Sequence, residues 1–417
     1  MPMTTYDWST RWLGGFCTLG IEEIQPVRHA AYAASPMMKT LLMLPEGAED
    51  HAAAPTMDVV LDAWSAYLGR GRDEMPLLLV RDTDIARRLL MQAAGVTEGE
   101  AVGAPAFCRR ALSESIKRVK GVPSFIELSD DLGYAADSPG LDALRVVWAQ
   151  PAAGMVVPEV PESAETFLVD YSFSLPLPIT EVTRLPGSAT IWGLHLATGF
   201  RAAEGALIAF HGDRGLALYD QVLAAMTVAE DLSLARALAQ SERLSGPQGL
   251  AARVLNIEAQ VREGMEIGAG LPIGPTGSAA LPLGVPVRIP DEADMSTILA
   301  YIRSELIPVD WLPEVQPIFY VAFQVTTDAA LTQRSATRAA RWIISPIGPD
   351  LSEEEVVHAV LGILKGAEYT GVRWYTNPAR AKWYGDLLTE WYGPAHDAYH
   401  RAFDVPADVE PVSAYDD

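Results

Sequence analysis

Cysteine is scarce in this chain of 417 residues, where Cys17 and Cys108 are the only two. Two cysteines are too few for a disulfide framework, and these two lack the pairwise spacing of a zinc site. We therefore expect a protein that works in a reducing cytoplasm and holds no structural metal. Lysine is also rare, with five residues at positions 39, 117, 120, 365 and 382.

Positive charge is in deficit, with 31 basic against 54 acidic side chains and a net charge of −23. A chain of this charge repels nucleic acid and anionic lipid surfaces, so we expect neither as a partner. No run of roughly 18 apolar residues occurs, and the first residues lack a basic start followed by an apolar stretch. We expect neither export nor membrane insertion.

The apolar content of 49% and the charged content of 20% are typical of a globular protein, and the length suggests two lobes. Between residues 77 and 210, short apolar runs alternate with helical patterns, which predicts a parallel sheet covered by helices. The expected strands are 77–80, 101–105, 123–128, 144–149, 166–173, 189–194 and 205–210. Helices are expected over 83–95 and 107–121, each closed by a glycine.

From about Pro247 the alternation of short apolar runs with helical patterns gives way to a different pattern. We therefore predict a large α/β domain over 20–246 and a smaller C-terminal α+β domain over 247–417. The segment 271–290 is rich in Gly and Pro, which predicts a connection or an irregular ribbon. A helix over 294–306, a strand over 317–325 and a helix over 350–366 should follow. Three Trp-Tyr pairs mark an aromatic C-terminal extension, and residues 1–19 should pack on the small domain or on a partner.

The order of these segments resembles the sugar aminotransferases of the DegT and StrS family, which are fold-type I enzymes that use pyridoxal phosphate. The resemblance covers roughly residues 20–365. It implies that Asp170, in FLVDYSF, lies where the family's aspartate binds the pyridine nitrogen. The family's lysine comes six residues before the glutamate of a Gly-Glu-Gly-Gly turn, which reads Ala203-Glu204-Gly205-Ala206 here. The lysine position therefore holds Thr198, which cannot form a Schiff base.

The phosphate loop also departs from the family pattern. The family's Ser-Gly-Thr is replaced by Arg81-Asp82-Thr83, followed by Asp84. A helix start binds phosphate through free backbone amides, and two carboxylates there would occupy those amides themselves. We therefore expect no cofactor.

Two further departures leave alternatives open. Where the family has an aromatic residue that stacks on the ring, this chain has Cys108-Arg109. Arg109 could clamp a carboxylate or lie exposed in a helix's first turn. We expect Cys108 to be a buried structural cysteine rather than a nucleophile. Bulky residues follow Asp170, which is either a functional carboxylate or one held by backbone amides.

The carboxyl ends of the strands should nonetheless form a site, because ligands of open α/β sheets bind there. The expected acid and base are His195 and Asp170, although a histidine at such a place is more often a satisfied core or loop residue. The expected substrate-binding residues are Arg81, Arg109, Thr198, Arg201 and Tyr171. Several arginines in so acidic a protein suggest an anionic small-molecule substrate.

Three functions remain open at this level. The first is an enzyme on an aminotransferase scaffold that works without pyridoxal phosphate, by elimination, isomerisation, cyclisation or group transfer. The second is a non-catalytic relative that binds a ligand or pairs with an active homologue, since family enzymes form dimers with shared sites. The third is a pyridoxal enzyme with a displaced lysine, such as Lys39. A homodimer, or a heterodimer with a homologue, is expected.

Overall fold

A computed structural model describes most of residues 55–347, together with residue 363. The segments that it leaves undescribed within that range are residues 107, 109, 131, 134, 136, 152–162, 173, 180–184, 186, 195–204, 226–233, 247–248, 264–278, 283, 292, 305–309 and 312–328. Within the described part, no helix is both long enough and apolar enough to cross a bilayer.

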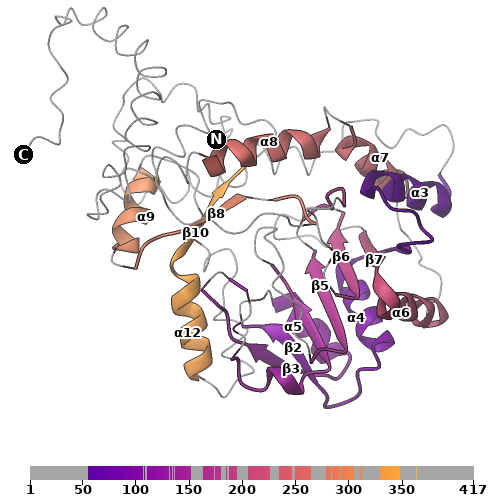
Figure 1. Cartoon of the computed structure of the whole chain (residues 1–417), viewed down its shortest axis with the longest axis horizontal. Coiled ribbons are helices and arrows are strands. Elements are labelled where there is room, and N and C mark those ends of the chain that lie inside the picture. The colour runs from indigo at the N-terminus through magenta and orange to yellow at the C-terminus, as the bar shows by residue number, and fades with distance from the viewer. Residues whose placement is uncertain are drawn as a thin grey trace, which may run out of the picture.

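The centre of the fold is a seven-stranded sheet with the order β1-β7-β6-β5-β4-β2-β3 (Figure 1). The buried apolar runs that predicted strands do form them, because such runs must be covered on both faces. The strands are β1 (Leu77–Val80), β2 (Ala101–Pro105), β3 (Val122–Ile126), β4 (Val146–Ala149), β5 (Thr166–Tyr171), β6 (Ala189–Gly193) and β7 (Ala206–Phe210).

The sheet is mostly parallel, which confirms the α/β prediction, but β7 runs against both of its neighbours. A mostly parallel sheet was expected, and β7 is the strand that departs from the parallel direction. Residues 194–205 connect β6 to β7, which are hydrogen-bonded neighbours that run antiparallel. This return brings β7 between β6 and β1.

Helices α4 (Thr83–Ala93), α5 (Arg110–Arg118) and α6 (Gly212–Ala225) cover one face of the sheet and share an apolar cluster with it. Helix α4 ends as expected, with Gly95 in the left-handed region at φ 71°. For α5 the expected glycine closure at Gly121 is wrong. There the left-handed residue is Lys120, at φ 65°, and Gly121 instead packs closely among Ile116, Val102 and Val96.

The opposite face packs against α3 (Met57–Leu68), α7 (Leu234–Leu244) and α8 (Leu250–Glu263), which lie in one row in Figure 1. Trp64 of α3 donates from Nε1 to the carbonyl of Ala237 in α7 at 3.1 Å. The same apolar cluster continues into a second, three-stranded sheet of order β8-β10-β9. A single stretch of core therefore supports both sheets.

The second sheet consists of β8 (Gly284–Arg288), β9 (Asp310–Trp311) and β10 (Trp342–Pro346), accompanied by α9 (Met295–Ser304) and α12 (Ala329–Ala339). A short 3₁₀ helix, η2 (Leu141–Ala143), precedes β4. The expected helix over 294–306 is confirmed as α9. The expectation that 271–290 holds only a connection or irregular ribbon is wrong at β8, whose Pro286 and neighbours pair with β10.

The strand expected over 317–325 and the Trp-Tyr pairs lie outside the described residues, as does the helix expected over 350–366 except for Ile363. Residues 1–19 lie outside them too. The domain boundary at residue 247 stays a prediction.

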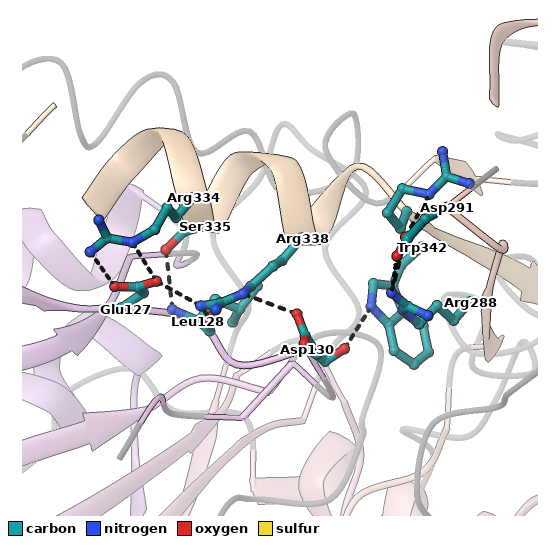
Figure 2. A network of polar contacts seen from close by, with 10 residues as sticks. Glu127, Leu128, Asp130, Arg288, Asp291, Arg334, Ser335, Arg338 and Trp342 are labelled. Atoms are coloured by element: carbon teal, nitrogen blue, oxygen red, sulfur yellow. Dashed lines mark hydrogen bonds and ion pairs between the residues drawn. The ribbon is translucent and has the colours of Figure 1, made fainter. Parts of the chain in front are cut away.

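A polar clamp holds α12 against the end of β3, and Figure 2 shows Arg334 and Arg338 reaching from that helix to Glu127. The Glu127 carboxylate, with its side chain 7% exposed, accepts from Arg334 Nε at 2.8 Å, Arg334 Nη2 at 2.6 Å and Arg338 Nη1 at 2.6 Å. Ser335 accepts from the amide of Leu128 at 3.1 Å. Hydrogen bonds from Arg334 hold the pKa of Glu127 below its usual range, against the opposing effect of burial.

Gly193, at the end of β6, should tolerate no side chain. A Cβ at this position would overlap the carbonyl oxygen of Ser172 at the end of β5, whereas a Cβ at Gly71 would meet nothing within 4 Å. Replacing Gly193 with Ala should therefore lower the free energy of unfolding by about 1–3 kcal/mol. Chemical denaturation measures this change, with Gly71→Ala as the control. Equal stabilities of the two variants would contradict the close approach of β6 to β5.

The clamp on Glu127 should make stability depend on pH. Glu127→Gln should lower the free energy of unfolding by about 1.5–3 kcal/mol at neutral pH, because it weakens charged hydrogen bonds. Since the folded pKa is depressed, this stabilisation is complete above the unfolded pKa of about 4.3 and is lost as the pH falls towards the lower folded pKa.

Urea denaturation at several pH values would show the difference between parent and variant shrinking on acidification. The matched control is Glu98→Gln, because the Glu98–Lys120 ion pair is exposed, at 75% and 69% of the two side chains. An exposed pair should contribute less than about 1 kcal/mol. A pH-independent difference for Glu127→Gln would contradict the clamp.

Candidate functional site

Strands β1 and β6 both run antiparallel to β7, which lies between them, and β5 runs parallel to β6. The carboxyl ends of β1, β5 and β6 therefore lie at the same edge of the large sheet. Arg81 follows β1 at this edge and is exposed. Its carbonyl accepts from the amide of Gly205 at 2.6 Å, and the amide of Leu194 donates to the carbonyl of Gly205 at 3.1 Å. The two described residues that flank the segment 195–204, Leu194 and Gly205, therefore lie next to each other beside Arg81.

Four of the predicted site residues lie outside the described residues, namely Arg109, His195, Thr198 and Arg201. His195, Thr198 and Arg201 all belong to the segment whose two ends meet at Arg81. Arg81, Asp170 and Tyr171 are described. The structure thus brings Arg81 and Asp170 to the same edge, and the roles proposed for the seven residues stay predictions.

Asp170 lies within β5, one residue before its end, and its side chain is 0% exposed. Its Oδ2 accepts from Nε of Arg87 at 2.7 Å and from Nε2 of Gln150 at 2.7 Å, while Oδ1 accepts from the amide of Ser172 at 2.8 Å. Arg87 comes from α4, and its side chain is 2% exposed. The carboxylate is therefore held by both a backbone amide and a buried cation.

The ionised form of Asp170 is favoured by these contacts. Burial on its own raises the pKa of this carboxyl, but the Arg87 guanidinium and the hydrogen bonds from Arg87 and Ser172 outweigh it and hold the pKa below its usual range. A carboxylate that is fully ionised and fully paired is a poor proton carrier near neutral pH.

Tyr171 points to the other side of the sheet, because successive side chains of a strand alternate between faces. It is 3% exposed and belongs to the apolar cluster under α3 and α7. Its partner in register, Trp192 of β6, is fully buried in the same cluster and donates from Nε1 to the carbonyl of Ala279 at 3.0 Å. Both rings fill space beneath the sheet edge.

The start of α4 is occupied by one carboxylate rather than two. Asp82 is the N-cap, and its Oδ1 accepts from the amide of Ile85 at 2.7 Å. Asp84 instead turns to α5, where it accepts from Ser115 Oγ at 2.7 Å and from Arg118 Nη1 at 2.6 Å. The expectation that both carboxylates occupy the helix amides is therefore wrong for Asp84.

Cys108 is 1% exposed and is a free thiol, as expected for a structural cysteine. Burial raises the pKa of this thiol to about 12, with the Asp170 carboxylate acting in the same direction and Arg87 opposing both. A thiol with this pKa is almost wholly protonated at neutral pH, and thiolate is the reactive form. Among the described residues, no group of three His, Cys, Asp or Glu side chains is placed to hold a metal ion.

Sequence reasoning missed Arg87, Gln150 and Ser172, which complete the surroundings of Asp170. A signal for Arg87 was present in the sequence. It lies on the helical stripe of Leu90 and Met91, at spacings of three and four residues, and all three are buried. A charged residue in an apolar stripe is buried only when it is paired, which points to a buried acidic partner.

No family model and no curated protein matches this sequence. Solved structures do resemble the fold. The aminotransferase TlmJ from Streptoalloteichus hindustanus is 17% identical at a TM-score of 0.54, with 84% of this chain and 97% of that chain covered. A DegT DnrJ EryC1 StrS aminotransferase from Brucella abortus is 15% identical at a TM-score of 0.57, covering 86% and 100%.

A third similar structure is Helicobacter pylori PseC, an aminotransferase involved in the biosynthesis of pseudoaminic acid, at 12% identity and a TM-score of 0.56. The match covers 84% of this chain and 98% of that chain. Identities this low establish the fold alone. The chain therefore has the fold-type I architecture of these aminotransferases, as the resemblance implied.

Cys108 should be inert in the folded protein. In a Cys17→Ser variant, a disulfide reagent at pH 8 should leave the remaining thiol unmodified under native conditions and modify it fully in denaturant, because burial excludes the reagent and keeps the thiol protonated. Absorbance of the released thiolate measures both states. Stoichiometric labelling within minutes under native conditions would show that Cys108 is accessible.

Proposed function

We propose that this chain is an enzyme that keeps the aminotransferase scaffold and works without pyridoxal phosphate, acting on a small anionic substrate in sugar-related or specialised biosynthesis. The observation that carries the proposal is that the chain's own side chains fill the polar positions on which that cofactor would depend. Asp82 takes an amide at the start of α4, and Arg87 takes the carboxylate of Asp170.

The phosphate end of the cofactor fits poorly. A helix start attracts a phosphate because its amides are free and its dipole is positive there. The Asp82 carboxylate already accepts from the Ile85 amide at 2.7 Å and places a negative charge at the same point. Like charges a few ångströms apart repel, so this cap disfavours a phosphate.

The ring end fits poorly for a different reason. A protonated ring nitrogen needs an acceptor oxygen and a compensating negative charge, and Asp170 would supply both. Its charge is already compensated by Arg87, and its oxygens accept three hydrogen bonds from Arg87, Gln150 and Ser172. A second cation would have to displace a buried one.

The lysines within the described residues do not replace the missing amine. Lys117 lies in the last turn of α5 and pairs with Glu114, and Lys120 pairs with Glu98 at 2.7 Å. Lys120 accepts through its carbonyl from the amide of Gly99, which precedes β2, so it lies at the amino edge of the sheet. Asp170 lies at the opposite, carboxyl edge. This placement supports the absence of Schiff-base chemistry.

Acid and base work then falls to His195, the remaining predicted catalytic group, with Asp170 acting to hold the strand end in place. An imidazole titrates near neutral pH, so it can both accept and donate a proton in an elimination, isomerisation, cyclisation or group transfer. Arg81, Arg109 and Arg201 would bind the anionic substrate, with Thr198 beside them. These roles are assigned from the sequence and from the meeting of the segment ends at Arg81.

The second candidate is a non-catalytic protein that binds a ligand or pairs with an active homologue. Its specific support is the closure of the described part of the site. Asp170 and Cys108 are both sealed from solvent, and the rings of Tyr171 and Trp192 are buried beneath the same edge. A site that has lost its reactive groups to the core can still serve as a binding surface.

Pyridoxal phosphate should not be retained by the purified chain. After incubation with excess cofactor and gel filtration, the protein should show no aldimine absorbance, and borohydride treatment should add no mass to any lysine. An aminotransferase of known cofactor content, treated in parallel, is the positive control. A stoichiometric mass label on Lys39 or another lysine would refute the proposal and favour the displaced-lysine enzyme.

The two remaining candidates differ in what His195→Gln changes. Parent and variant are each incubated with a small-molecule extract, and the consumed and retained compounds are identified by mass spectrometry. The enzyme should consume one compound that the variant retains without converting it. Retention without conversion by both proteins, with co-purification of a co-expressed homologue, would instead establish the non-catalytic function.

A further inference from the structure

The polar groups around Asp170 come from two sources. Gln150 and Ser172 follow β4 and β5 directly, so they are fixed by the sheet edge itself. Among the residues that the structure describes, Arg87 is the contributor that comes from a helix, and 83 residues separate it from Asp170 in sequence. The surroundings of the carboxylate therefore divide into polar groups that belong to the sheet edge and one cation that comes from a helix.

The sheet-borne groups are held independently of Arg87. The amide of Ser172 donates to Oδ1 of Asp170 at 2.8 Å, and Nε2 of Gln150 donates to Oδ2 at 2.7 Å. These bonds fix the orientation of the carboxylate without any contribution from α4. Loss of the Arg87 guanidinium would leave an oriented, buried carboxyl group without its cation.

Two nitrogens of the Arg87 guanidinium donate hydrogen bonds to two different acceptors. Nε donates to Oδ2 of Asp170 at 2.7 Å, and Nη2 donates to Oγ of Ser172 at 2.7 Å. These nitrogens are bonded to one carbon, so the two acceptors recognise a planar N–C–N edge. This is the fork geometry by which guanidinium groups are bound in preference to the ammonium of lysine.

We propose that Asp170, Ser172 and Gln150 form a receptor for an amidinium or guanidinium group, and that Arg87 is its resident occupant. The helix α4 delivers that occupant and thereby closes this part of the sheet edge to external cations. This proposal goes beyond the proposed function and does not require it. It concerns only which cation occupies the site formed by Asp170, Ser172 and Gln150, whatever reaction the chain performs.

The test is to remove the resident occupant and supply a free one. In the full-length Arg87→Ala variant, millimolar methylguanidinium chloride should raise Tm in a saturable way relative to sodium chloride at the same concentration. A ligand that binds only the folded state stabilises it by mass action. Methylammonium chloride should have a smaller effect, because it offers no N–C–N edge.

Matched variants separate the receptor from general salt effects. Arg88→Ala removes the neighbouring arginine, whose side chain is 38% exposed and pairs with Asp84, and it should show no response to methylguanidinium. The parent should show none either, since its receptor is full. The double variant Arg87→Ala/Asp170→Asn should lose the response because the negative charge is gone. Equal responses in all four proteins, or no response in Arg87→Ala, would overturn the proposal.

Arg87→Ala could be insoluble on its own, since it leaves a buried charge unpaired. The measurement is then the yield of soluble protein on refolding with methylguanidinium against sodium chloride. A higher yield with methylguanidinium in Arg87→Ala, absent in Arg88→Ala, supports the receptor, and equal yields overturn it. Retention of pyridoxal phosphate by the parent would refute the proposed function and leave these results unchanged, so the two failures are distinguishable.

Discussion

The buried ion pair between Arg87 and Asp170 is the constraint on which the candidate site depends. Two opposite charges with side chains 2% and 0% exposed persist only because each satisfies the other and neighbouring groups complete their hydrogen bonds. The pair therefore ties α4 to the end of β5 at one distance and one orientation. It also sets the chemistry nearby, since the ionised Asp170 helps to keep the Cys108 thiol protonated.

Around this pair, the chain has the sheet of the aminotransferase fold, but polar groups at the carboxyl edge of that sheet bind the chain's own side chains. The sheet order, the reversed β7 and the meeting of Leu194, Gly205 and Arg81 create the edge at which α/β proteins bind ligands. At that edge Asp82 caps a helix and Arg87 pairs with Asp170. Structures at 12–17% identity share the fold, and a shared fold does not carry a shared reaction.

Arginine side chains also pair with a buried carboxylate at the clamp between β3 and α12. Of the basic side chains in this acidic protein, Arg334 and Arg338 converge on the single carboxylate of Glu127. Arginine suits both places because its planar group donates several hydrogen bonds in a fixed geometry. One apolar cluster extends across the two sheets, and its buried surface stabilises the fold. The ion pairs therefore serve mainly to fix the orientation of the helices against the sheet.

The sequence alone determined the strands from β1 to β7, because runs of four to six buried residues flanked by turn residues identify themselves locally. It also identified the Asp82 cap and the buried Cys108. Helices α3, α6, α7, α8 and α12 were not predicted, and neither were the strands β8, β9 and β10 or the direction of β7. Only the tertiary structure decided that Arg87 meets Asp170, that Asp84 turns to α5 and that Tyr171 faces the core. Those outcomes depend on pairings between segments distant in sequence, where a buried charge must find its partner in space.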